Sequence, residues 1–184
     1  MSLTSGFTWN DLTTSVGGVG SRAFPSTYTP PDTNNYNTAS VNISVTVSPK
    51  DISITGVQAA DREYNGLKTV VLSDGVLQGV ETGDTADIDV TLGMGTMQNK
   101  DVGSNKSVTT GITLSGSASG NYTLTQPANV TVNISAKNLT ITDVTATDRE
   151  YDGTQMVSIT GGTLVGVITG DSVSQVVRHG REKP

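Results

Sequence analysis

The chain has 184 residues and a formal net charge of −6 at pH 7; charged residues make up only 15% of it and aromatic residues 4%. This balance argues against a nucleic-acid partner, because most affinity for nucleic acid comes from Lys and Arg, of which there are only 11. Cysteine is absent, which excludes disulfides, thiolate metal sites and a cysteine nucleophile. No apolar run approaches the roughly 20 residues that span a bilayer, so we expect no membrane insertion in this segment.

Residues 1–49 are expected to be the C-terminal part of a preceding domain. They end in the alternating run SVNISVTV (40–47), and they offer Trp9 and Phe24 for a core. Alternation of apolar and polar residues with a period of two is typical of a strand with one face in a core. The sequence therefore predicts that one domain ends just before Lys50 opens the next.

The chain then repeats itself. The 35 residues from Lys50 align without a gap with those from Lys137, a shift of 87 residues (137 minus 50), and eighteen of the aligned pairs are identical. A period of this length is too long for one turn of a solenoid and suits a small all-β domain. Residues 50–136 are therefore expected to form one complete repeat, and residues 137–184 the N-terminal part of a second one.

Seven short strands are expected within the complete repeat. Thr suits the pleated surface of a strand, and Gly with Asn and Asp supplies turns, so the Thr-rich and Gly-rich composition favours strands over helices. The expected fold class is all-β, an elongated tandem array of immunoglobulin-like β-sandwiches or related open barrels. Turn signals such as Asn65-Gly66, Asp74-Gly75 and Gly93 to Gly95 separate the candidates. The predicted strands are 51–58, 68–73, 75–80, 86–92, 106–114, 121–125 and 129–135.

One charged motif occurs in both repeats and resembles the signature of the YDG-type repeat. The segment from Lys100 to Leu124 is similar to the second half of that family, so the resemblance covers 50–136 and begins again at 137. The first segment, with FTWNDL and YTPPDTNNYNT, resembles the end of a bacterial immunoglobulin-like repeat. The residues of the shared motif are Asp61, Arg62, Glu63, Tyr64 and Gly66, and their counterparts Asp148, Arg149, Glu150, Tyr151 and Gly153.

The resemblance implies a place in bacterial surface adhesins and filamentous-haemagglutinin-like exoproteins, where such modules are stacked in a stalk. It implies no known active site. We therefore expect a non-enzymatic structural repeat of a cell-surface or secreted protein, located outside the cell. The expected partners are neighbouring repeats, a second copy in a strand-exchanged homodimer, and a host glycan or surface protein. Two alternatives stay open: a carbohydrate- or host-protein-binding module, and an accessory domain of a secreted enzyme.

Four carboxylates are weak candidates for a calcium site. Asp61 and Glu63 in the shared motif, with Asp87 and Asp89 in the run DTADIDV, supply the hard oxygen ligands that calcium prefers. Asp87 and Asp89 have no acidic counterpart in the second repeat. The structural interpretation of the motif is therefore favoured, and no cofactor is expected.

In the structural interpretation, the motif forms a corner of the domain. Arg62 pairs with a carboxylate, Tyr64 packs at the corner and Asn65-Gly66 makes a turn, with Gly66 and Gly153 in the left-handed region that glycine alone enters readily. This interpretation needs no ligand.

Catalysis finds little support in the sequence, and the chain is not expected to be an enzyme. The sole histidine, His179, lies in the divergent tail Arg178–Pro184, so a Ser-His-Asp triad would depend on that tail. Glu63, Glu81 and Asp84 offer a glycosidase-like carboxylate pair. Acidic residues with this spacing normally occupy solvated turns instead.

Two further chemistries are considered and not favoured. Lys50 and Lys137 recur where repeats begin, but an isopeptide bond needs a buried lysine and no sequence feature buries them. Tyr28, Tyr36 and Tyr122 are the candidates for stacking against a sugar. We expect Tyr36 and Tyr122 to be core residues instead, because each precedes the last strand of its domain.

The second repeat is expected to need a partner. Its apolar residues form one face of a sheet, without the strands that the first repeat supplies from Lys106 onward. We expect this face to pack against a complementary segment, from residues 1–49 or from a second chain. The residues of the face are Leu139, Ile141, Val144, Val157, Ile159, Leu164 and Val167.

Overall fold

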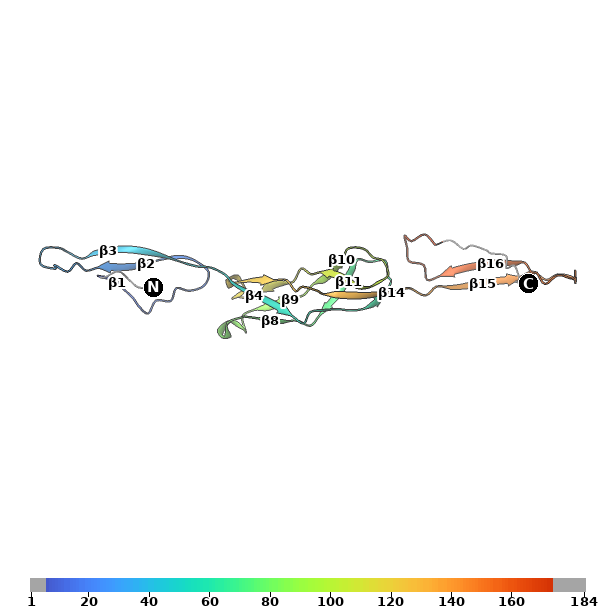
Figure 1. The fold of residues 1–184 in the computed structure, drawn as a ribbon, viewed down its shortest axis with the longest axis horizontal. Helices are drawn as coiled ribbons and strands as arrows, with labels where there is room; N and C mark the ends of the chain where they lie inside the picture. The colour runs from blue at the N-terminus through green and yellow to red at the C-terminus, as the bar shows by residue number, and fades with distance from the viewer. Residues whose placement is uncertain (1–5, 174–184) are drawn as a thin grey trace. The chain divides into compact units, whose positions relative to one another are not determined.

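The computed structural model describes residues 6–173 and confirms the all-β class (Figure 1). Within these residues the helical elements are two single turns of 3-10 helix, η1 (Thr82–Asp84) and η2 (Ser119–Asn121), and no helix there is long and apolar enough to cross a membrane. The described residues form two compact units, which we treat separately. The first comprises 6–55, 75–91 and 112–127, and the second comprises 56–74, 92–111 and 128–173.

The first unit begins with a three-stranded antiparallel sheet in the order β1-β2-β3. Between β2 and β3, nine consecutive residue pairs follow one another without a bulge. The rings of Trp9 and Phe24 meet edge to face at 6.4 Å, so the two aromatic residues expected to pack in this segment do contact each other. The strands are β1 (Phe7–Trp9), β2 (Gly20–Tyr28) and β3 (Ala39–Val47).

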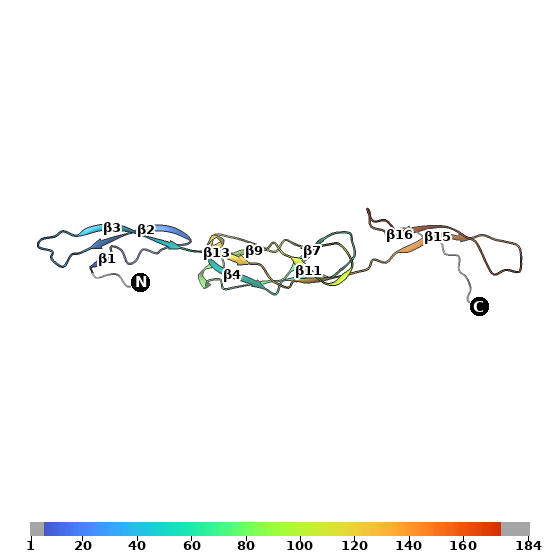
Figure 2. The same ribbon diagram turned by 45° about the horizontal axis from the view of Figure 1, so that its top comes forward.

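The rest of the first unit comes from three separate stretches of the first repeat. Strand β4 runs parallel to β13 and antiparallel to β8, while β9 pairs with β12; Figure 2 shows β4 beside β13. The buried side chains of Ile52, Ala118 and Tyr122 form the core here. The strands are β4 (Lys50–Thr55), β8 (Val76–Gln78), β9 (Asp89–Thr91), β12 (Thr113–Ser115) and β13 (Tyr122–Thr125).

The second unit contains a six-stranded sheet in the order β5-β7-β10-β11-β14-β6. Only Ala60 and Asp61 separate β5 from β6, yet these two strands lie at opposite edges of the sheet. One short segment thus supplies both edges of the sheet. The two edges must therefore lie near each other, and the sheet curves into a half-barrel. The strands are β5 (Gln58–Ala59), β6 (Arg62–Glu63), β7 (Thr69–Ser73), β10 (Met94–Met97), β11 (Gly103–Thr109) and β14 (Thr131–Ser135).

Alternate residues of these strands build the core of the half-barrel. In β14, Val132 and Ile134 are buried while their neighbours in the strand are exposed, as the period of two predicts. Val70 and Leu72 of β7 and Met97 of β10 belong to the same cluster. Burying an aliphatic side chain of this size contributes about 1.5–3 kcal/mol, so this cluster is the main source of stability for the half-barrel.

The structure corrects two parts of the strand prediction. The glycine-rich stretch 93–95 was predicted to be a turn, but Gly95 lies buried in β10, where an added Cβ would approach Val108 Cγ1 to 2.4 Å. Glycine here permits close packing and does not mark a turn. The predicted strand 106–114 is interrupted at Ile112, whose backbone N–H and C=O bind the side-chain amide of Gln126 at 2.9 and 2.8 Å.

The described part of the second repeat forms an antiparallel pair of strands, β15 (Thr140–Ala146) and β16 (Ile159–Val165), visible in Figure 1. Their register reproduces that of the first repeat residue for residue. Pairing between these two segments therefore depends on their own sequences, which the two repeats share. The matching pairs are Ile141–Leu164 with Ile54–Leu77, and Ala146–Ile159 with Ala59–Leu72.

Candidate interface between successive repeats

The shared motif forms a turn organised by Arg62. Its guanidinium donates to Asn65 Oδ1 and, at 2.7 Å, to the backbone oxygen of Leu67. Asn65 Oδ1 also accepts from the Leu67 N–H at 3.0 Å, and Gly66 has φ of +79°. The predicted turn with a left-handed glycine is confirmed. The predicted carboxylate partner of Arg62 is wrong, because an amide oxygen and backbone carbonyls accept its N–H groups.

The motif adopts the same turn in the second repeat. Arg149 binds Asp152 and, at 2.5 Å, the backbone oxygen of Thr154, whose N–H donates to Asp152 Oδ1 at 2.9 Å. Gly153 has φ of +76°. The backbone N–H of Thr154, with the guanidinium of Arg149, lowers the pKa of Asp152 below its ordinary value. The turn therefore forms from its own local bonds in both repeats.

The first motif also holds a carboxylate of the second repeat. The Tyr64 hydroxyl donates to Asp171 Oδ2 at 2.6 Å, while the Tyr64 side chain packs against the core of the half-barrel. The Lys100 ammonium binds Asp171 Oδ1 and lies 5.7 Å from the centre of the Tyr64 ring, a cation–π distance. Asp171 thus receives two donors from the preceding repeat, and its side chain is only 21% exposed.

These contacts shift the pKa values of both charged groups. Lys100, followed by the Tyr64 hydroxyl, lowers the pKa of Asp171, and Asp171 raises the pKa of Lys100. Both shifts favour the charged forms, because the charged Lys100 ammonium donates a hydrogen bond to the charged Asp171 carboxylate. The ion pair is therefore complete throughout the neutral pH range.

Further contacts join the motif to the residues that follow it. Glu63 accepts from Lys137 Nζ at 3.0 Å, and a Cβ at Gly66 would lie 2.7 Å from Ile168 Cγ2. An apolar hollow of about 140 Å³ lies beside these contacts. We call the set the junction; it comprises Glu63, Tyr64, Gly66 and Lys100 on one side and Lys137, Ile168 and Asp171 on the other.

Asp61, the first residue of the motif, acts within its own repeat. Its two carboxylate oxygens accept from the backbone N–H of Asn133 at 2.7 Å and from Asn133 Nδ2 at 2.8 Å. The Asn133 side chain is the main reason that the pKa of Asp61 is lowered. These bonds fasten the segment between β5 and β6 to β14, and so they help to close the half-barrel.

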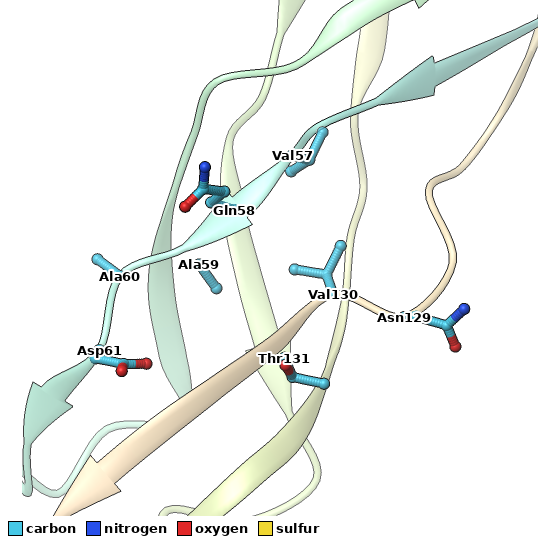
Figure 3. A pocket seen from close by; sticks show the side chains of 8 residues that line it. All are labelled: Val57, Gln58, Ala59, Ala60, Asp61, Asn129, Val130 and Thr131. Carbon is cyan, nitrogen blue, oxygen red and sulfur yellow. The ribbon is translucent and has the colours of Figure 1, made fainter.

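A hollow of about 520 Å³ lies beside that closure (Figure 3). Ala59 and Val130 lie on its two sides, and Asp61 stands at one end. No aromatic ring lines it, so it lacks the stacking surface that sugar sites use. The lining residues are Val57, Gln58, Ala59, Ala60, Asp61, Asn129, Val130 and Thr131.

Asp84 and Asp87, two further carboxylates singled out from the sequence, have protein partners of their own. Asp87 accepts from the Ser117 hydroxyl at 3.0 Å, and Asp84 accepts from the Tyr122 hydroxyl at 2.6 Å. Asp89 lies on β9. Across residues 6–173, no three acidic or histidine side chains are grouped to hold a metal ion.

The two lysines that open the repeats also have carboxylate partners. Lys50 pairs with Glu81 at 2.5 Å and keeps 48% of its side chain exposed, and Lys137 pairs with Glu63. Neither offers the buried amine that an isopeptide bond requires. His179 and the tail Arg178–Pro184 lie outside the described residues.

The tyrosine predictions have mixed outcomes. Tyr122 is buried in the core of the first unit, as predicted. The prediction for Tyr36 is wrong: it is 67% exposed, because it lies in the loop between β2 and β3, where its N–H donates to the Asp32 carbonyl at 3.2 Å. Tyr28 is half-buried and its ring lies 5.0 Å from that of Phe7.

Sequence reasoning missed three members of the junction, Lys100, Ile168 and Asp171. Asp171 closes the aligned block and matches Asp84, so its identity in both repeats was a usable signal. Lys100 gives no comparable signal, because its contact depends on how segments far apart in the chain meet.

Comparison with known proteins gives one result. The family model of the YDG domain matches residues 48–130 and matches again over residues 135–178. No curated protein and no solved structure matches the chain. The two family matches together cover well over half of the sequence, and the junction joins residues of the first match to residues of the second. The chain therefore belongs to the YDG domain family.

Proposed function

We propose that this chain is a non-enzymatic structural part of a bacterial cell-surface or secreted adhesin-like protein, in which successive YDG domains form a stalk. The observation that carries the proposal is the junction, where Tyr64 and Lys100 of one repeat hold Asp171 of the next. Fixed side-chain contacts restrict how one domain turns against its neighbour, whereas a flexible linker would leave it free.

Two further features support the proposal. No Gly-, Ser- or Pro-rich linker separates the two repeats in the sequence. Lys137, the first residue of the second repeat, pairs with Glu63 of the first repeat. The three-stranded sheet of β1 to β3 precedes the first repeat, and we assign it to the end of an immunoglobulin-like domain of the same stalk. Immunoglobulin-like packing of the YDG domains themselves is part of this proposal.

The test is a series of chains in which one, two or three further copies of residues 50–136 are inserted after Ala136. Small-angle X-ray scattering should show a maximum dimension that grows by the same amount with each copy. A maximum dimension that grows only as the cube root of the mass would show a compact globule and would contradict a stalk.

A matched series tests whether the junction is what stiffens the array. Each inserted copy carries Tyr64→Phe and Lys100→Met, which remove both donors to the next carboxylate while keeping their apolar contacts. We expect the scattering curves of this series to show a flexible chain of domains. Equal rigidity in the two series would mean that other contacts set the geometry.

A binding role is the alternative proposal, and the hollow in Figure 3 is the place to test it. Its volume falls in the range of small-molecule sites. The chain should be applied to a glycan array and to matrix proteins, alongside Ala59→Trp, which fills the hollow. Binding that Ala59→Trp abolishes would favour this role, and no binding on either surface would leave the structural role alone.

A further inference from the structure

The hollow in Figure 3 lies between two segments of the chain that pair with each other before and after it in the sequence. Strand β4 runs parallel to β13 at an offset of 72 residues (122 minus 50), and β6 runs parallel to β14 at the same offset (134 minus 62). The lining residues follow this offset as well, because 57–59 correspond to 129–131. The hollow is therefore the place where the two segments separate.

Local backbone features account for the separation. Asn129 has φ of +63° and Gly56 has φ of +77°, so each segment contains a residue in the left-handed region, which interrupts an extended strand. Pro127 lacks the N–H group that a strand ladder needs. The gap is thus built into the sequence of the first repeat.

Backbone groups on both sides of the hollow point into it. Ala60 donates its N–H to β7 at 3.1 Å, and alternate residues of an antiparallel pair face the neighbouring strand, so Ala59 turns its own N–H and C=O away from β7. On the other side, the Val130 carbonyl accepts a bond of 2.9 Å from β11, so Thr131 turns its backbone groups away from β11. Both Ala59 and Thr131 line the hollow, which is therefore a slot bordered by two strand edges.

Asp61 closes one end of the slot and gives that end a negative charge. Pairing of β6 with β14 resumes directly after it, at Arg62. Each carboxylate oxygen of Asp61 accepts one bond from Asn133, which leaves half of the roughly four acceptor positions of a carboxylate unused. Among the eight described residues that line the hollow, Asp61 alone is charged. The closed end is therefore suited to a cation.

We propose that the slot binds an extended peptide as an added strand, antiparallel to β5 and β14, with the free α-ammonium group of the peptide at Asp61. Both lining segments run toward Asp61, because its partner Asn133 follows Thr131 in β14. An antiparallel peptide therefore reaches the closed end with its N-terminus, and it pairs with both edges in the more stable pattern. A parallel peptide would bring its C-terminal carboxylate to Asp61, where like charges repel.

The core beside the slot adds a side-chain preference. Ala59 packs against the cluster that contains Val130, and a peptide residue opposite Ala59 points to the same side of the sheet. A small apolar residue fits there, whereas its neighbours in the peptide point to solvent and are expected to be polar. Main-chain bonds supply affinity in this mode of recognition, and alternate side chains supply specificity. The added strand deepens the binding role proposed above as the alternative, on which it rests, and it does not depend on the stalk.

The probe is a positional-scanning library of hexapeptides with free N-termini and a fluorophore on a C-terminal lysine, added to the whole chain. We expect saturable changes in anisotropy with mixtures that carry a small apolar residue at one of the first three positions. Acetylating the peptide N-terminus should weaken binding at least about tenfold, the effect of one lost hydrogen bond to a charged group. No saturable binding by any mixture at about 1 mM would overturn the proposal.

Amide hydrogen exchange locates the bound peptide. The N–H groups of Ala59 and Thr131 should exchange at least about tenfold more slowly with a binding peptide, because the peptide supplies them with acceptors. The N–H of Ala60 already donates to β7 and should not change. Slowing at Ala60 and not at Ala59 would contradict the added strand.

Matched tryptophan variants test the location. Ala59→Trp fills the slot and should abolish binding, whereas Val71→Trp places the same side chain on the outer face of β7, where Val71 is 58% exposed, and should bind normally. Asp61→Asn should remove the difference between free and acetylated peptides, and the acetylated peptide tests the same charge without a change in the chain. Equal affinity of both tryptophan variants, or a preference for free N-termini that survives Asp61→Asn, would overturn the assignment.

Two outcomes separate the added strand from the binding role in general. If glycans or matrix proteins bind and Ala59→Trp abolishes their binding, while no peptide mixture binds, the binding role stands and the added strand is wrong. If nothing binds in either experiment, both are wrong.

Discussion

The Tyr64 hydroxyl donates a hydrogen bond of 2.6 Å to Asp171, which lies 107 positions further along the chain. Asp171 is the counterpart of Asp84, and Asp84 accepts a bond of the same length from Tyr122. One carboxylate position is therefore bound by a tyrosine in both repeats. In the first repeat that tyrosine belongs to the same domain, and in the second it belongs to the domain before.

We predict that Tyr64→Phe weakens the junction. Losing the bond to Asp171 should cost about 0.5–1.5 kcal/mol, the usual net value of one hydrogen bond, and should speed amide exchange at residues 166–171. Tyr151→Phe is the matched control, because Tyr151 is 97% exposed and should show no change. Similar exchange rates in the two variants would mean that the Tyr64 hydroxyl does not hold the second repeat.

Glycine substitutions separate backbone strain from contact across the junction. Gly66→Ala and Gly153→Ala both force alanine into the left-handed region, at a cost of about 1 kcal/mol in unfolding free energy. Only at Gly66 does the new Cβ also meet a neighbour, Ile168 at 2.7 Å, while nothing lies within 4 Å of the Cβ at Gly153. Chemical denaturation should show the larger loss for Gly66→Ala. Equal losses of unfolding free energy in the two variants would show that Ile168 does not contact the turn.

The junction should weaken in acid. The pKa of Asp171 is lowered, mainly by Lys100, so its contribution is complete above the pKa of an unfolded aspartate, about 3.9. It is lost as the pH falls through the lower folded value. Carbon-13 NMR of the Asp171 carboxyl group should show the depressed pKa, and Lys100→Met should move it upward. An unchanged pKa of Asp171 in the Lys100→Met variant would show that Lys100 does not cause the depression.

The buried glycine of β10 should tolerate no side chain. In Gly95→Ala the Cβ meets Val108 at 2.4 Å and Leu72 at 3.0 Å, so overpacking should cost about 1–3 kcal/mol of stability. Gly111→Ala is the matched control, since no atom lies within 4 Å of its Cβ, and it should change stability by less than about 0.5 kcal/mol. Thermal denaturation followed by circular dichroism would compare the two.

Sequence patterns predicted the strands and turns that depend on residues close together in the chain. The strand predicted at residues 129–135 is present as β14, and the repeated block predicted a second copy, in which the strand register matches that of the first. The turn at Gly66 followed from its sequence, because its bonds run between residues only a few positions apart.

Features that depend on distant segments escaped prediction. β6 has two residues and exists because Ile134 of β14 lies beside Arg62. In the sequence Gly95 resembles a turn residue, whereas in the structure Val108 packs so closely against it that no side chain fits. Lys100 belongs to the junction only because Asp171, 71 positions further along the chain, lies next to it. In each case the deciding partner is remote in sequence, so composition and period give no sign of it.

Two parallel strand pairs have a mechanical consequence. β4, where the chain enters the first repeat, runs parallel to β13, and β14, where the chain leaves it, runs parallel to β6. Tension along the polypeptide pulls the two members of each pair in opposite directions along their common axis. All hydrogen bonds of a pair then carry the load together in shear, and they do not open one after another as a zipper would.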